Sequence, residues 1–200
     1  MGREYLMEYA TNMVVESDEK IARRVQKGEG ERFGELVERY QSKLMRYARK
    51  FLLDPDDAKD IVQDIFIKTY ENMQGFDATR RFSPWVYRIA HNEFVNALKK
   101  RHAHRSAFTF DLDTVFPHIA AEETADSASM DRDLRETLEH HLEKLSPKYR
   151  EPLILYYLEG MDYKEVSEIL QIPISTVGVR LARGRAMLKK EAEAQVYPYG

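Results

Sequence analysis

The basic side chains near the end of the chain carry the clearest chemistry. Five of them follow Gly178 with no acidic residue among them: Arg180, Arg183, Arg185, Lys189 and Lys190. Guanidinium and ammonium groups bind phosphate oxygens, and an arginine can also donate two hydrogen bonds to the edge of a guanine. This segment therefore predicts contact with nucleic acid.

Apolar residues on both sides of Pro173 predict how this basic segment is held. They recur at helical spacing: Val166, Ile169, Leu170, Val177, Leu181 and Leu188. Because a proline disfavours helix for the residue before it, the pattern predicts two helices and a tight turn. Gln171 stands where such turns often have glycine, and a left-handed backbone there would cost about 1 kcal/mol. The segment indicates a DNA-binding helix-turn-helix, although a helical hairpin with a solvated basic face has the same pattern.

The rest of the chain predicts an all-α fold, since periodic apolar residues recur and no strand pattern is present. We expect helices over residues 18–27, 31–53, 56–73, 84–101, 131–145 and 147–158. Ser17, Ser83 and Ser146 are the expected caps, the last two with a proline at the next position. Arg88, Asn92 and Lys99 recur at spacings of four and seven residues, which places them on one polar face.

Charge and composition divide the chain into two small helical domains joined by a flexible acidic linker. Residues 80–105 hold seven basic residues and one acid, whereas residues 111–143 hold ten acids and two arginines. Two basic segments around an acidic one fit a protein that contacts phosphate at two separate places. We expect five segments: an N-terminal arm (1–16), a domain (17–103), a linker (104–130), a domain (131–192) and a tail (193–200).

Composition also excludes several classes of protein. With 43% hydrophobic and 32% charged residues, the chain can form packed cores and stay in solution. It has no cysteine, which excludes disulfides and cysteine–zinc sites. The N-terminal residues do not resemble a signal peptide, and the longest apolar run, 153–158, is too short for membrane insertion. These features predict a cytoplasmic protein.

Two further motifs make the chain resemble the ECF (extracytoplasmic function) sigma factors of bacterial RNA polymerase. DDAKDIVQDIFIKTYENM (56–73), followed by FSPWVYRIAHNE (82–93) and a basic helix end, resembles their region 2. LSPKYREPLILYYLEGMDYKEVSEILQIPISTVGVRLARGRAMLKK (145–190) resembles their region 4. The resemblance covers residues 17–192. It implies a transcription initiation subunit that is not an enzyme, has no cofactor, and recognises the −10 and −35 promoter elements.

The resemblance assigns polymerase docking to the helix over 56–73. The residues expected to meet the β′ clamp are Asp60, Gln63, Asp64, Ile67 and Lys68. Exposed carboxylates suit an arginine-bearing partner, although a charged helix face is more often only solvated. Ile67 favours docking, because this apolar residue lies off the expected buried stripe of Ala58, Ile61, Val62, Ile65 and Thr69. The β subunit, promoter DNA and an anti-sigma factor are the other partners that the resemblance suggests.

The resemblance assigns DNA recognition to two places. The −10 element would meet Phe76, Arg80, Arg81, Trp85, Arg88, Asn92 and Lys99, with Tyr87 as a further ring that could stack on an unpaired base. Trp85 equally suits a core position at the start of an amphipathic helix. The −35 element would meet Ser175, Thr176, Val179, Arg180, Arg183 and Arg185. Gly178 departs from the family, since many relatives have a basic residue there.

Two other classes compete with this interpretation. A repressor that binds DNA alone would account for residues 161–190 but not for the pattern between residues 57 and 101. A helical metalloenzyme needs ligands that share a helix face, and the adjacent His140 and His141 do not, so we expect no metal. The acidic linker would, by resemblance, thread through polymerase channels that later carry nucleic acid. A solvated spacer would have the same composition.

Overall fold

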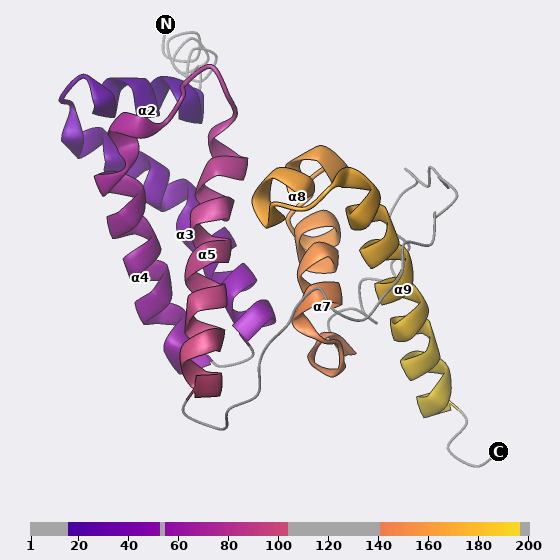
Figure 1. The fold of residues 1–200 in the computed structure, drawn as a ribbon. Coiled ribbons are helices and arrows are strands. Elements are labelled where there is room, and N and C mark those ends of the chain that lie inside the picture. Colours follow the sequence, from indigo (N-terminus) through magenta and orange to yellow (C-terminus); the bar gives the residue numbers. More distant parts are fainter. Residues whose placement is uncertain (1–15, 53–54, 104–140, 197–200) are drawn as a thin grey trace, which may run out of the picture.

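The computed structural model describes residues 16–52, 55–103 and 141–196. All regular structure within these ranges is helical, and it forms two domains joined by the segment that lies outside them (Figure 1). The all-α, two-domain prediction is therefore confirmed. The predicted arm, the linker with its acidic residues, and the expected helix start at 131–140 lie outside the described residues.

Within residues 16–103, apart from 53 and 54, the first domain contains four described α-helices: α2 (Asp18–Gln26), α3 (Phe33–Leu52), α4 (Pro55–Glu71) and α5 (Phe82–Ala103). Short 3-10 turns at Gly30–Arg32 and Met73–Gly75 lead into and out of the α3–α4 pair. Helices α3, α4 and α5 pack together, and α2 crosses one end of them (Figure 1). The apolar stripes predicted from the sequence form this core, with large side chains buried at its centre: Leu36, Leu44, Tyr47, Phe51, Ile65 and Phe94.

The ends of these helices agree with the sequence in one case and differ in another. Ser17 caps α2 as predicted, and its side chain accepts a hydrogen bond from the backbone of Lys20. Helix α5, however, begins at Phe82, so the prediction that Ser83 caps it was wrong. The reason is tertiary: the Phe82 backbone N–H donates to the Glu19 carboxylate of α2 over 3.0 Å. A side chain from another helix thus supplies the cap.

The second domain contains three α-helices in the described residues: α7 (Pro147–Leu153), α8 (Tyr163–Leu170) and α9 (Ile174–Val196). Within the expected helix over 131–145, the described residues Leu142–Lys144 form a 3-10 turn. The expected helix over 147–158 is α-helical only to Leu153 and continues as a π-helical turn, Ile154–Leu158. Pro152, which cannot donate to the helical ladder, lies just before this change.

The turn between α8 and α9 has the geometry that the sequence suggested. Gln171 adopts a left-handed backbone with φ 55° and ψ 42°, as expected of this turn position. Its side-chain amide donates to the Glu168 carbonyl over 2.6 Å, and the Ser167 hydroxyl donates to the Ile172 carbonyl over 2.6 Å. These local bonds help to hold a conformation that a non-glycine residue adopts at a cost. The turn therefore fixes the angle at which α9 leaves α8.

A buried carboxylate of the second domain joins it to the first. Glu159, at the end of the π-helical turn, accepts two 2.8 Å hydrogen bonds from the Arg46 guanidinium of α3. It also accepts a 2.6 Å hydrogen bond from the Tyr87 hydroxyl of α5. Burial, together with this carboxylate, raises the pKa of Tyr87, so its hydroxyl stays protonated and can donate. The paired geometry is that of a strong arginine–carboxylate contact.

A second buried carboxylate, Glu151 of α7, completes the domain contact. One of its oxygens lies 2.5 Å from the Tyr47 hydroxyl and 2.7 Å from Nδ1 of His91. Next to it, the Arg150 guanidinium lies over the ring of Phe51, 5.6 Å from the ring centre. Burial lowers the pKa of Arg150. The two domains therefore meet through a polar network in which carboxylates of the second domain accept from the first.

Candidate nucleic-acid and protein interfaces

Helix α4 turns its predicted docking residues to the solvent. Asp60, Gln63, Asp64 and Lys68 are exposed, and the Ile67 side chain is 49% exposed. Lys68 pairs with Glu93 of α5 at 2.5 Å. Because exposed isoleucine is costly to leave in water, Ile67 is the residue of this face that most favours a protein partner.

An apolar groove lies beside this face, between α3 and α4. It has a volume of about 730 Å³, and its apolar lining includes Phe33, Val37, Met45, Phe66, Ile67 and Tyr70. Sequence reasoning did not find the groove, because its residues come from two helices. The signal available in the sequence was Tyr70, which lies outside the buried stripe of α4 and is 50% exposed. The groove and the charged face together form one mixed surface, which is typical of protein interfaces.

Hydrogen bonds within the loop between α4 and α5 hold it in a defined turn. The Asp77 carboxylate accepts hydrogen bonds from the Thr79 backbone over 2.9 Å and from its hydroxyl over 2.7 Å. These bonds lower the pKa of Asp77. The backbone of Arg80 closes the turn by donating to the Asp77 carbonyl over 2.9 Å. The loop thus places Arg80 and Arg81 next to each other at its exposed end.

The aromatic residues of this region are less accessible than the sequence suggested. Phe76 is only 5% exposed, and its ring packs against Phe82 and Trp85 at centroid distances of 5.4 and 4.9 Å. Tyr87 is buried and stacks on Tyr47. Both rings are therefore buried in the described conformation, and their contact with the −10 element stays a prediction. Trp85 remains half-buried at the edge of this cluster.

The two loop arginines are paired with acidic residues of α8. Arg80 Nη2 lies 2.9 Å from the Glu168 carboxylate, and Arg81 pairs with Glu165. The arginine side chains are 62% and 69% exposed, so these pairs are screened by water and contribute little to stability. Further along α5, Arg88, Asn92 and Lys99 are all exposed, as their spacing predicted. A cationic surface therefore extends from the loop along α5.

Helix α9 presents its basic side chains around a buried stripe. Val177, Leu181 and Leu188 are buried, as predicted, while Ser175 is exposed. The remaining predicted contacts are partly exposed: Thr176, Val179, Arg180, Arg183 and Arg185. The Arg185 guanidinium donates to the Tyr157 hydroxyl over 3.3 Å and so reaches back toward the domain.

Gly178 leaves room on α9. A Cβ placed there would lie 3.7 Å from the Tyr163 ring, which is an ordinary contact. Close packing therefore does not explain the glycine. Gly184 is the opposite case, since a Cβ there would approach Leu153 Cδ1 to 2.8 Å. A Cβ at Gly184, unlike one at Gly178, would force the Leu153 side chain of α7 to shift.

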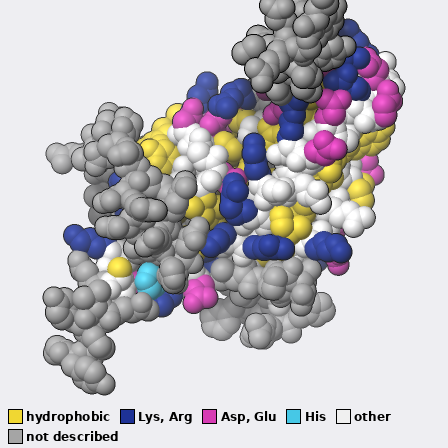
Figure 2. Space-filling view, turned by 180° about the vertical axis from the view of Figure 1, so that it is seen from behind, with side chains coloured by type: hydrophobic (Ala, Val, Ile, Leu, Met, Phe, Trp, Pro, Cys, Tyr) yellow, Lys and Arg dark blue, Asp and Glu magenta, His cyan; other side chains and the backbone are white. Residues whose placement is uncertain are grey.

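Basic side chains lie in several small groups and do not cover one whole face of the protein. In the view from behind, Lys and Arg side chains lie among acidic and hydrophobic ones (Figure 2). Among the described residues there is no group of three side chains able to hold a metal ion, and no helix is apolar enough over a sufficient length to cross a bilayer. The fold and these surfaces define a two-domain helical protein with a helix-turn-helix, a second cationic surface and a separate face of α4 that combines charged residues with an apolar groove.

Comparison with known proteins identifies the family. Residues 36–104 match Sigma-70 region 2, and residues 135–188 match Sigma-70 region 4. The chain is 32% identical to the ECF RNA polymerase sigma factor SigW of Bacillus subtilis over 180 residues, covering 86% of this chain and 95% of that protein. It is 28% identical to the ECF sigma-E factor of Haemophilus influenzae, covering 88% and 96% of the two chains.

Solved structures agree with this result. CnrH, solved in complex with the cytosolic domain of CnrY, superposes with a TM-score of 0.64 and 25% identity, covering 90% of this chain and 99% of that one. RpoE of Bartonella quintana, solved with the anti-sigma factor NepR, gives a TM-score of 0.62 and 26% identity over 80% and 96% of the chains. The chain belongs to the ECF family of RNA polymerase sigma factors. It acts in transcription initiation, and its relatives are transcription regulators.

Proposed function

We propose that each of the three surfaces performs one binding task of a sigma factor. The exposed face of α4, with Asp60, Asp64 and Ile67, docks on the β′ clamp of core RNA polymerase. The α4–α5 loop and the exposed face of α5 bind the −10 element, and α9 binds the −35 element. The observation that carries this proposal is the presence, in one chain, of a helix-turn-helix and a separate domain with its own exposed cationic residues.

The −10 assignment is supported by chemistry and by position. Arg80 and Arg81 stand together on an ordered loop, and Arg88, Asn92 and Lys99 continue along α5. Cations that follow a path suit the backbone of a single strand. We assign the buried Phe76 to the support of the loop, and Trp85 to the edge where an unpaired base could pack.

DNA binding by the loop arginines would require a change in the domain contact. Phosphates would take the place of Glu165 and Glu168 as partners of Arg81 and Arg80. Because both arginines are mostly exposed, these pairs exchange at little cost. Engagement of the −10 element would therefore release α8 from its two ion pairs with the loop. The described conformation is the one in which the loop arginines are occupied.

The same proposal covers partners and location. The solved relatives CnrH and RpoE were captured with CnrY and the anti-sigma factor NepR, and we include an anti-sigma factor among the partners of this chain. The β subunit of the polymerase is included as well. Because its partners are the polymerase and promoter DNA, we place the protein in the bacterial cytoplasm, with no catalytic role of its own. The domain boundaries 17–103 and 131–192 are part of the proposal.

Replacing Arg180 or Arg183 by alanine should weaken binding to the −35 element. Each change is expected to cost about 1–3 kcal/mol and to relax the preference at one or two base positions. The measurement is the affinity of the holoenzyme for a set of promoters that carry every single-base change in the −35 element.

Lys190 provides the matched control, since it is exposed two turns beyond Arg183 on the same helix. Lys190→Ala should cost less and should affect all promoters equally, as expected for a phosphate contact. If Arg180→Ala and Arg183→Ala also weaken all promoters equally, the two arginines bind phosphate and do not read bases. No loss with either variant would contradict the placement of α9 in the groove.

A further inference from the structure

Helix α2 contacts the backbone of the loop that precedes α5. The side-chain amide of Gln26 donates two hydrogen bonds, to the Met73 carbonyl over 2.9 Å and to the Phe76 carbonyl over 2.7 Å. Gln74 donates back to the Gln26 carbonyl over 3.2 Å. Gln26 therefore spans the first turn of the loop with one side chain and uses both of its amide donors.

Two other residues of α2 hold the rest of the loop in the same way. Arg23 donates to the Ala78 carbonyl over 3.2 Å, and the Glu19 carboxylate accepts from the Phe82 backbone over 3.0 Å. Residues 19, 23 and 26 are spaced by four and three, so they share one face of α2. This face meets the beginning, the middle and the end of the loop. The side chains of Glu19, Arg23 and Gln26 all bond to backbone atoms of the loop, so these contacts do not depend on the loop's own side chains.

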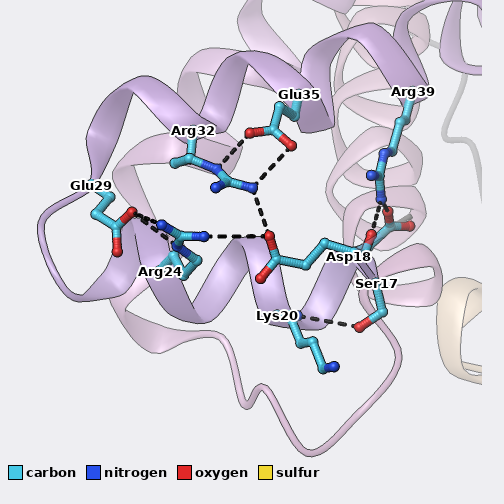
Figure 3. Close-up of polar contacts among 9 residues, drawn as sticks. Ser17, Asp18, Lys20, Arg24, Glu29, Arg32, Glu35 and Arg39 are labelled. Carbon is cyan, nitrogen blue, oxygen red and sulfur yellow. Dashed lines mark hydrogen bonds and ion pairs between the residues drawn. The ribbon is translucent and has the colours of Figure 1, made fainter. Parts of the chain in front are cut away.

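Helix α2 is itself anchored to the rest of the first domain. Its apolar residues Ile21, Ala22 and Val25 are buried, and ion pairs tie its polar side to α3 and the turn before it (Figure 3). Arg24 pairs with Glu29 at 2.6 Å, and Asp18 pairs with Arg39 at 2.6 Å. The helix is therefore fixed independently of the loop. Such an element can impose its shape on the loop.

From these contacts we infer that Gln26 is a positioning residue for promoter recognition. It sets the conformation of the loop and thereby the choice of −10 sequence, although it does not touch DNA. This inference rests on the proposed role of the loop in binding the −10 element. A loop held through its backbone keeps one shape whatever bases it meets, and a fixed shape is what discrimination between bases requires.

The test uses the full chain with three substitutions. Gln26→Met keeps the length of the side chain but removes both donors, and Gln26→Lys restores donors at the same place. Lys20→Met changes an exposed residue of the same helix as a control. The first readout is hydrogen exchange at the amides of Gly75, Phe76 and Arg80, which are bonded within the loop. The second is the affinity of the holoenzyme for promoters that differ at each −10 or −35 position.

For Gln26→Met we expect exchange in the loop to become about fivefold to tenfold faster, as suits the loss of two ordinary hydrogen bonds. Discrimination between −10 sequences should fall by about the same factor, while −35 discrimination and core affinity stay unchanged. Gln26→Lys should recover most of both effects, and Lys20→Met should show neither.

The two readouts separate the possible failures. Unchanged exchange in Gln26→Met would overturn the positioning role itself. Faster exchange with unchanged −10 discrimination would show that Gln26 positions the loop but that the loop does not read the −10 element, which overturns both the inference about specificity and the proposed role of the loop. Equal losses for −10, −35 and core binding would show a general loss of structure, and would also overturn the inference.

Discussion

Reversing two charges on α4, by Asp60→Arg together with Asp64→Arg, is expected to weaken binding to core RNA polymerase by roughly a hundredfold. Both carboxylates are exposed on the face that also carries Ile67. If they meet cationic groups of the β′ clamp, the change replaces two attractions by two repulsions, which costs about 3 kcal/mol. The fold should persist, because neither side chain is part of the core. Affinity for core enzyme, measured by titration, checks the prediction.

A matched control separates the face from the overall charge. Glu31→Arg with Glu38→Arg makes the same change in net charge at exposed positions outside α4. This variant should keep core affinity within about twofold, since distant surface charges are screened at physiological salt. Equal weakening by both pairs of changes would point to a general charge effect. Unchanged affinity of the α4 variant would show that α4 is not the docking face.

Neutralising the two buried carboxylates of the domain contact, by Glu151→Gln with Glu159→Gln, is expected to separate the domains. Each carboxylate accepts charge-assisted or short hydrogen bonds from the first domain, and hydrogen bonds to charged groups contribute about 1.5–3 kcal/mol. A glutamine keeps the shape of the side chain, but it replaces one carboxylate oxygen by an NH2 group, which cannot accept a hydrogen bond from the Arg46 guanidinium. Loss of roughly 4 kcal/mol would shift the equilibrium strongly toward the open arrangement.

The distance between the domains can be measured directly, because the chain has no cysteine. Fluorophores on Lys43→Cys and Met187→Cys, both at exposed positions, report the separation of α3 and α9. The double variant should show a longer distance and bind single-stranded −10 DNA more tightly, since Arg80 and Arg81 are released. The exposed pair Glu38→Gln with Glu143→Gln should change neither property. An unchanged distance in the double variant would mean that these carboxylates do not hold the domains together.

Local patterns predicted most of the helices because periodic apolar residues must face a core. The stripes of α3 and α4 and the buried residues of α9 were found in this way, and Gln171 marked a left-handed turn. The predictions that were wrong concern local structure that depends on other parts of the fold. Ser83 looked like a cap, but Glu19 of another helix takes that role. The π-helical turn after Leu153 also has no periodic signal, since a short apolar run looks alike in both forms.

For the candidate surfaces too, the sequence predicted many of the exposed residues, but it did not predict their contacts with other helices. Ile67 and the charges of α4 could be placed outside because they lie off the apolar stripe. The burial of Tyr87 could not be predicted, because its ring stacks on Tyr47 of another helix, and the burial of Phe76 depends on the fold of the loop that brings its ring onto Phe82. The pairing of Arg80 and Arg81 with α8 also depends on how the domains meet. The contacts of Gln26 show the same limit, since a glutamine in an amphipathic helix gives no sign of its partners.

Transcription in vitro is the most direct test of the proposed roles of the −10 and −35 surfaces. Core RNA polymerase is supplied with this protein and a promoter library in which the −10 and −35 elements are randomised, and the transcripts are sequenced. We expect initiation that depends on the protein and selects defined bases in both elements. Arg80→Ala with Arg81→Ala should relax selection only at −10, and Arg180→Ala only at −35. Sequence-specific binding to duplex DNA by the protein alone, with no stimulation of core polymerase, would contradict the proposed function.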